Sequence, residues 1–124
     1  MSDYVPAANN HGVIRDVNRE QGFATLTLNR PDRLNSLGSD LLKSLVDSLE
    51  SVASDDSIRA VIITGSGRAF CSGADTDEMA GGKSDGPHKL GPTGAEGLRR
   101  GFHLAQELIL GVHQMEKPVI AAIN

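Results

Sequence analysis

The most constraining feature of this sequence is a nearly continuous apolar run at residues 58–64 that leads into a turn of small residues. Such a short run, rich in β-branched side chains, is typical of a strand covered on both faces of a sheet. Residues 69–75 (AFCSGAD) follow it with little side-chain bulk. Small side chains let a ligand touch the main chain, and backbone N–H groups held in such a turn can stabilise an oxyanion. A plain tight connection is the alternative interpretation.

The pattern before this run predicts two strands and a helix. Residues 13–17 and 23–28 have the apolar alternation of strands, and the proline at position 31 ends the second one. Residues 41–52 repeat apolar side chains every three or four positions, which predicts an amphipathic helix. Ser36 or Ser39 is the candidate cap for its start.

The pattern after the run predicts a second helix at residues 95–115 and a buried-type strand at 119–123. The helix is expected to be amphipathic, with an apolar stripe made of Leu98, Phe102, Ala105, Leu108, Ile109 and Val112. Together with strand 58–64, these elements predict an α/β fold containing a right-handed βαβ unit.

Three stretches fall outside this pattern. Residues 1–12 are predicted to form a flexible N-terminal tail, and residues 13–124 are predicted to form the folded part. Five glycines and two prolines in residues 81–94 exclude regular structure, so we expect a mobile loop beside the site, with plain disorder as the alternative. The sequence stops at Asn124 directly after a buried-type strand, which predicts a chain cut inside a domain.

Composition excludes several classes of protein. The 124 residues carry a formal charge of −4 without a dense cationic stripe, which argues against nucleic-acid binding. The apolar runs are too short to span a membrane, so no membrane partner is expected. A single cysteine, Cys71, cannot form an internal disulfide, and this fits a reducing, cytoplasmic location.

Three segments together resemble successive signatures of the crotonase, or enoyl-CoA hydratase/isomerase, superfamily. They are NRPDRLNSL at residues 29–37, RAVIITGSGRAFCSGADTDEM at 59–79 and KPVIAAIN at 117–124. The resemblance implies a crotonase-like spiral of repeated β-β-α units, truncated after the strand ending near Asn124. Residues 13–124 would form its N-terminal part.

The resemblance also implies the site. The family stabilises the enolate of an acyl-CoA thioester with two backbone N–H donors, and the Ala74 N–H matches the first, so Ala74 is the expected catalytic and substrate-binding residue. Other positions that match the family's substrate-binding regions are Arg33, Leu34, Ser72, Gly73, Asp75, Thr76 and Asp77. Arg33 is either a contact for a CoA phosphate or a solvated charge. Some hydratases have lysine where this chain has Asp77, which argues against a phosphate contact there.

The function implied is that of an acyl-CoA-binding enzyme of the hydratase/isomerase type, with hydration of trans-2-enoyl-CoA as the default reaction. The second donor and the catalytic glutamates of the family would lie beyond Asn124. The partners implied are an acyl-CoA, the missing C-terminal half of the same protein and further copies in a homotrimer or hexamer. No cofactor is expected besides the coenzyme A of the substrate, and no metal. The alternative is a catalytically inactive fragment or an interaction module.

Other chemistries have weaker support. Cys71 lacks the His and Asn arrangement that activates a thiol nucleophile. His103 and Glu107 have metal-ligand spacing, but a charge pair on a helix surface fits equally well. Asp75 and Glu78 are either an acid/base pair or complements to a helix dipole. The residues around Gly67 fail the dinucleotide-binding glycine pattern.

Overall fold

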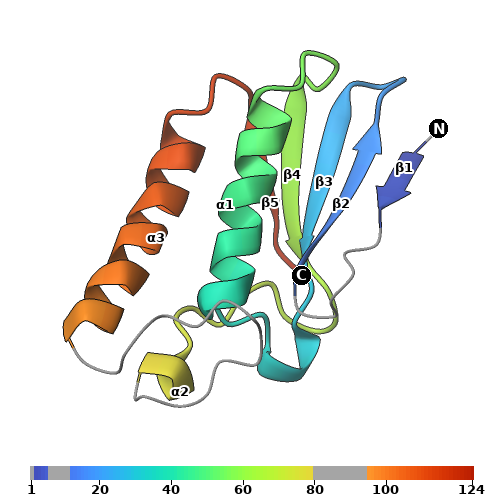
Figure 1. Cartoon of the computed structure of the whole chain (residues 1–124). Coiled ribbons are helices and arrows are strands. Elements are labelled where there is room, and N and C mark those ends of the chain that lie inside the picture. The colour runs from blue at the N-terminus through green and yellow to red at the C-terminus, as the bar shows by residue number, and fades with distance from the viewer. Residues whose placement is uncertain (1, 6–11, 80–94) are drawn as a thin grey trace.

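A computed structural model describes residues 2–5, 12–79 and 95–124, with side chains from residue 12 to 79 and from 98 onward. Its sheet has the order β1-β2-β3-β4-β5 (Figure 1). The strands are β1 (Ser2–Val5), β2 (Val13–Asn18), β3 (Phe23–Leu28), β4 (Ala60–Gly65) and β5 (Val119–Ala122). The first three pair antiparallel, whereas β4 is parallel to β3 and β5 is parallel to β4. The α/β class and four of the strands are as the sequence predicts.

The strand β1 was not predicted. Ser2 lies opposite Asn18 and Val5 opposite Arg15, so these residues add an antiparallel edge to the sheet instead of forming a loose tail. Backbone groups make this pairing, and the short stretch has no apolar alternation by which a strand could be recognised. Residues 6–11, also assigned to the tail, and the loop 81–94 lie outside the described residues.

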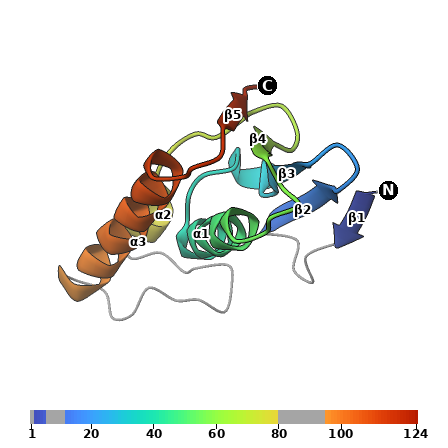
Figure 2. The same ribbon diagram turned by 90° about the horizontal axis from the view of Figure 1, so that it is seen from above.

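The helix α1 (Ser39–Ala53) supplies most of the helical part of the core. It packs on β2 and β3, and α3 (Ala95–His113) lies beside it on the same side of the sheet (Figure 2). Its buried apolar side chains recur every three or four residues, as predicted, and meet the apolar side chains of β3 and β4. The core includes Ala24, Leu26, Leu28, Leu41, Leu45, Leu49, Val52, Ile58 and Val61.

The apolar stripe predicted on α3 is present but mostly uncovered. Leu108 packs against the core and Ala105 is half-buried, but the Phe102 and Ile109 side chains are 65% and 67% exposed. Leu98 and Val112 are exposed as well. The strand β5 is likewise more open than predicted, because Val119 packs against the core but Ile120 and Ile123 are exposed. Amphipathic spacing identifies an apolar face, but it does not say what covers it.

None of the helices among the described residues is long and apolar enough to cross a membrane.

The parallel strands β3 and β4 end at the same edge of the sheet. The segments that follow them, residues 29–38 and 66–75, meet at this edge, together with the 3-10 turn Pro31–Arg33 and the short helix α2 (Thr76–Met79) (Figure 1). The carboxyl ends of parallel strands are where open α/β sheets usually bind ligands. Every residue of the predicted site lies on these segments or in α2.

Candidate functional site

Two backbone hydrogen bonds join the segments that carry the predicted site. The Ser72 N–H donates to the Leu34 carbonyl over 3.0 Å, and the Leu37 N–H donates to the Gly73 carbonyl over 2.7 Å. Leu37 and Ala74 thereby form a parallel bridge. The structure thus places Arg33 and Leu34 side by side with residues 72–77, although about forty positions separate the two groups in the sequence.

The side chain of Asn35 holds this arrangement together from inside. Asn35 is fully buried, and its Oδ1 accepts the Arg30 N–H at 2.8 Å. Its Nδ2 donates to the Ser66 carbonyl at 3.0 Å and to the Ala69 carbonyl at 2.8 Å. One side-chain amide therefore bonds main-chain groups of both the segment after β3 and the segment after β4. Buried backbone groups would otherwise have to find other partners.

The backbone at Asn35 also explains the choice of residue. Its φ is +54°, in the left-handed region that asparagine tolerates better than most side chains. Leu34 has a similar φ of +51°, which is uncommon for a bulky residue. The sequence reasoning did not single out Asn35. The signal available was an asparagine placed directly after a proline-initiated turn.

Gly65 lets the chain fold back at the end of β4. A Cβ there would lie 2.5 Å from the carbonyl oxygens of both Ala69 and Phe70, and 2.8 Å from the Asn35 Nδ2. These are backbone atoms and a buried amide, so they have little room to move. Only a residue without a side chain permits this close approach.

The Ala74 N–H points away from the segment that it bridges. Its peptide group shares a plane with the Gly73 carbonyl, which is bonded to Leu37, and in a trans peptide the C=O and N–H point in opposite directions. Gly73 has a φ of +101°, a conformation that favours glycine. Within the described part of the chain, no acceptor takes the Ala74 N–H, and the residue itself is exposed. The turn therefore offers one backbone donor to a ligand oxygen.

The side chain of Asp75 is engaged inside the protein. Its Oδ2 lies 2.5 Å from the Arg30 Nη1, and both side chains are less than a tenth exposed. Its Oδ1 accepts the Glu78 N–H at 3.1 Å and so begins α2. Burial acts to raise the pKa of Asp75, but the hydrogen bonds from Arg30 and the Glu78 N–H outweigh it and lower the pKa. Asp75 is therefore a carboxylate, not a proton donor, at neutral pH, and both of its oxygens are engaged by groups of the protein.

Glu78 provides the cap that the sequence reasoning assigned to a serine. The Glu78 Oε2 accepts the Ser39 N–H at 3.0 Å, while Gly38 occupies the N-cap position without a side-chain bond. The prediction of a Ser36 or Ser39 cap is therefore wrong. The Ser36 hydroxyl instead accepts from Arg30 at 3.2 Å. A carboxylate at this end of α1 complements the helix dipole.

The remaining predicted residues lie toward solvent. Ser72, Thr76 and Asp77 are exposed, and the Arg33 Nη1 lies 2.6 Å from the Asp77 Oδ2 in an exposed ion pair. A positive charge is thus present beside the turn but is shared with Asp77.

The alternative chemistries find little support in the geometry. Cys71 packs against the core, and its Sγ lies 3.4 Å from the Gly73 N–H, which is a structural contact. His103 and Glu107 contact one another at 3.3 Å as neighbours on the surface of α3. Among the residues that the structure describes, no three His, Cys, Asp or Glu side chains are placed to hold a metal ion.

The fold and the sequence together define the class of protein. The structure superimposes on an enoyl-CoA hydratase/carnithine racemase from Magnetospirillum magneticum with a TM-score of 0.75 and 30% identity, covering 94% of this chain and 39% of that one. A monofunctional enoyl-CoA isomerase from M. smegmatis matches with a TM-score of 0.63 and 29% identity, covering 93% of this chain and 41% of that one. The predicted crotonase-like fold is confirmed for this region.

Residues 18–124 match the family model of enoyl-CoA hydratase/isomerase, and the chain belongs to that family. It is 43% identical over 112 residues to a probable enoyl-CoA hydratase of Mycobacterium leprae (strain TN), covering 90% of this chain. It is 36% identical over 105 residues to the 1,2-epoxyphenylacetyl-CoA isomerase of Escherichia coli (strain K12), covering 85% of this chain. The chain spans little more than a third of the length of these relatives, 36% and 37%.

Proposed function

We propose that this chain forms the acyl-thioester side of an active site for enoyl-CoA hydratase/isomerase chemistry. The observation that carries the proposal is the orientation of the Gly73–Ala74 peptide, whose N–H is directed away from its own fold at the carboxyl edge of the sheet. Family membership supports an acyl-CoA thioester as the ligand. The Ala74 N–H would donate to the thioester oxygen.

The default reaction is hydration of a trans-2-enoyl-CoA. Polarising the thioester carbonyl makes C3 of the enoyl group electrophilic, so that water adds there and the electron pair moves through C2 onto the oxygen. The resulting enolate carries more charge on that oxygen than the substrate does, so a fixed N–H donor stabilises the enolate more strongly. A proton then returns to C2. No redox cofactor is required, because water adds across a double bond without a change in net oxidation state.

The complete reaction requires more than Ala74 provides. A second donor is needed for full stabilisation of the enolate, and removing one such donor typically costs about 10²–10³ in kcat. Acid/base groups are needed to activate water and to deliver the proton. We propose that these groups lie outside this chain, in a polypeptide that completes the longer span of the relatives, and that the working assembly contains several copies.

A second candidate function follows from the same geometry. With one donor in the turn and a third of the relatives' length, the chain would bind acyl-CoA without converting it, as a catalytically inactive fragment or an interaction module. Assaying the pure 13.1 kDa chain with crotonyl-CoA tests whether the chain needs further groups for catalysis. We expect binding without hydration, whereas turnover by the chain alone would show that all catalytic groups are already present.

Binding is tested by following the Ala74 amide in a ¹⁵N-labelled sample. Crotonyl-CoA should shift this resonance, whereas coenzyme A without an acyl group should not, because only the thioester offers the carbonyl. Gly73→Ala should abolish the shift, since an alanine is strained at a φ of +101° even though its Cβ would meet no atom within 4 Å. Gly111→Ala, also with open space, is the matched control. If crotonyl-CoA and coenzyme A shift Ala74 equally, the proposed donor role is wrong.

A further inference from the structure

The Arg30–Asp75 pair is a deeply buried ion pair. Its two side chains are 6% and 7% exposed and join positions 45 residues apart. Removing two charges from water is costly, and a buried ion pair is often no more stable than a well-packed apolar pair. Such a pair is better explained by the geometry that it specifies than by the stability that it adds.

Hydrogen bonds restrict both partners of this pair. The Arg30 guanidinium also donates to the Ser36 carbonyl and hydroxyl, and the Arg30 N–H is held by Asn35. Asp75 uses its second oxygen for the Glu78 N–H. The ion pair therefore connects the loop after β3 to the start of α2. The candidate donor Ala74 directly precedes Asp75 in the chain.

The Ala74 peptide is thus fixed from both sides. On its N-terminal side, the Gly73 carbonyl is bonded to Leu37. On its C-terminal side, the Asp75 side chain is bonded to Arg30. Rotation of the peptide that carries the Ala74 N–H would have to break one of these contacts. Oxyanion stabilisation depends on a donor that is already aimed before the charge develops.

We propose that Arg30 is a positioning residue, which acts through Asp75 to hold the Ala74 N–H in the direction needed to meet the thioester oxygen. This inference rests on the proposed function for its ligand, but the positioning itself is a property of the free protein. Neither side chain touches substrate in this role.

Gly38 offers a way to disturb the pair without removing a charge. A Cβ at this position would lie 2.6 Å from the Glu78 Oε2, 2.9 Å from the Arg30 Nη1 and 3.2 Å from the Asp75 Oδ2. All three atoms are the ends of flexible side chains, so Gly38→Ala should fold while displacing the ion pair. Its φ of −77° is accessible to alanine.

The test measures the direction of the Ala74 N–H in the free chain by residual dipolar couplings. Asp75→Asn, which keeps the shape but removes the charge, and Gly38→Ala should both change the Ala74 coupling. Leu49→Ala, a core substitution in α1 away from the turn, should leave this coupling unchanged while lowering stability, so it controls for a merely structural effect. An unchanged Ala74 coupling in a folded Gly38→Ala or Asp75→Asn variant would overturn the proposal.

A titration with crotonyl-CoA separates this inference from the proposed function. In the parent chain the Ala74 resonance should shift, and in both site variants Kd should rise about tenfold, as expected for one weakened hydrogen bond. Leu49→Ala should bind as the parent does. If the parent's Ala74 does not respond to crotonyl-CoA, the proposed function fails and Arg30 loses its role toward a thioester. The couplings would still decide whether the ion pair orients the peptide.

Discussion

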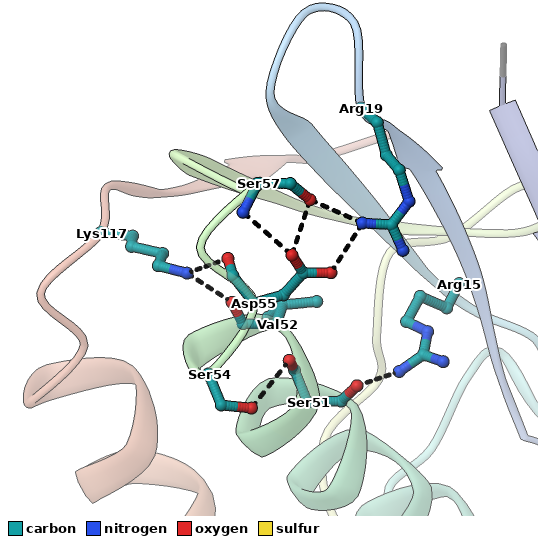
Figure 3. A network of polar contacts seen from close by, with 8 residues as sticks. All are labelled: Arg15, Arg19, Ser51, Val52, Ser54, Asp55, Ser57 and Lys117. Carbon is teal, nitrogen blue, oxygen red and sulfur yellow. Dashed lines mark hydrogen bonds and ion pairs between the residues drawn. The ribbon is translucent and has the colours of Figure 1, made fainter.

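Charged side chains from distant parts of the chain bond to backbone groups at both ends of α1, but the two ends differ. At the N-terminal end, polar groups from three segments converge: Arg30 and Asn35 from the loop after β3, Asp75 from the segment after β4, and Glu78 from α2. At the C-terminal end, Lys117 donates to the carbonyls of Val52 at 2.7 Å and Asp55 at 2.8 Å (Figure 3).

The polar groups at the C-terminal end are more open to solvent. The Asp55 carboxylate accepts from the N–H and hydroxyl of Ser57 and from Arg19, whose side chain is 52% exposed (Figure 3). This network satisfies backbone carbonyls at the C-terminal end of α1 and links that end to the β2–β3 hairpin through Arg19. It contains no residue with a positive φ.

The contrast shows where this fold uses buried polar contacts. Of the five left-handed residues in the described part of the chain, Gly22 lies in the β2–β3 turn, and the other four lie at the site end, where the buried Arg30–Asp75 pair is also found: Leu34, Asn35, Gly67 and Gly73. Irregular backbone has no periodic hydrogen bonds to hold it, so side chains must do so. A helix terminus needs only its last carbonyls satisfied, and the ammonium of the half-buried Lys117 achieves that.

The largest effect is expected for Asn35→Ala. It removes three hydrogen bonds, leaves the buried Arg30 N–H and the partly buried carbonyls of Ser66 and Ala69 without their partner, and places alanine at a φ of +54°. We expect a loss of about 3–5 kcal/mol in the free energy of unfolding, measured with urea. Lys43→Gln, which breaks an exposed pair with Asp47, is the control and should cost no more than about 0.5 kcal/mol. A loss near that of the control would show that the site loops are held by other contacts.

A smaller effect is expected at the opposite end for Lys117→Met. Methionine keeps the apolar stem but removes the ammonium that bonds two carbonyls at the end of α1. We expect a loss of about 1–2 kcal/mol in urea unfolding, with the Ala74 resonance unchanged. The neighbouring Glu116→Gln is the exposed control. A shifted Ala74 resonance would mean that the two ends are coupled.

The smallest effect concerns acid stability at Asp55. Hydrogen bonds from the Ser57 hydroxyl and N–H, with a further contribution from Arg19, lower its pKa to about 2. Because the folded-state pKa lies below the ordinary value of 3.8, this carboxylate stabilises the fold above that value, and the contribution is lost as the pH falls from about 4 to about 2. Urea midpoints should therefore fall less steeply over this range in Asp55→Asn than in the parent. Parallel pH profiles would contradict the assignment.

The elements with regular spacing were predictable from the sequence. The three- and four-residue steps from Leu41 to Val52 identified α1 and its buried face, and the apolar run before Thr64 identified β4. These signals are local, because each residue's environment follows from the helix or strand period. The exposure of Phe102 depends instead on which other segments reach α3, and no spacing within the helix contains that information.

The sequence predicted which segments carry the candidate site, but it did not predict the contacts that hold these segments together. The small residues around Ala74 predicted accessible backbone, and Ala74 is exposed in the structure. The partner of Asp75 was not visible, because Arg30 precedes it by 45 positions with no local pattern to connect them. The cap on α1 was missed for the same reason, since Glu78 follows Ser39 by 39 positions.

The Asn35 amide has a consequence for how the molecule opens. Because one side chain bonds to Arg30, Ser66 and Ala69, its release frees main-chain groups in both loops at once. The N–H groups of Leu37 and Ser72, which join the same loops, should then become accessible to solvent in a single cooperative event. Their hydrogen–deuterium exchange rates should converge on one opening free energy, and Asn35→Ala should accelerate both by the same factor.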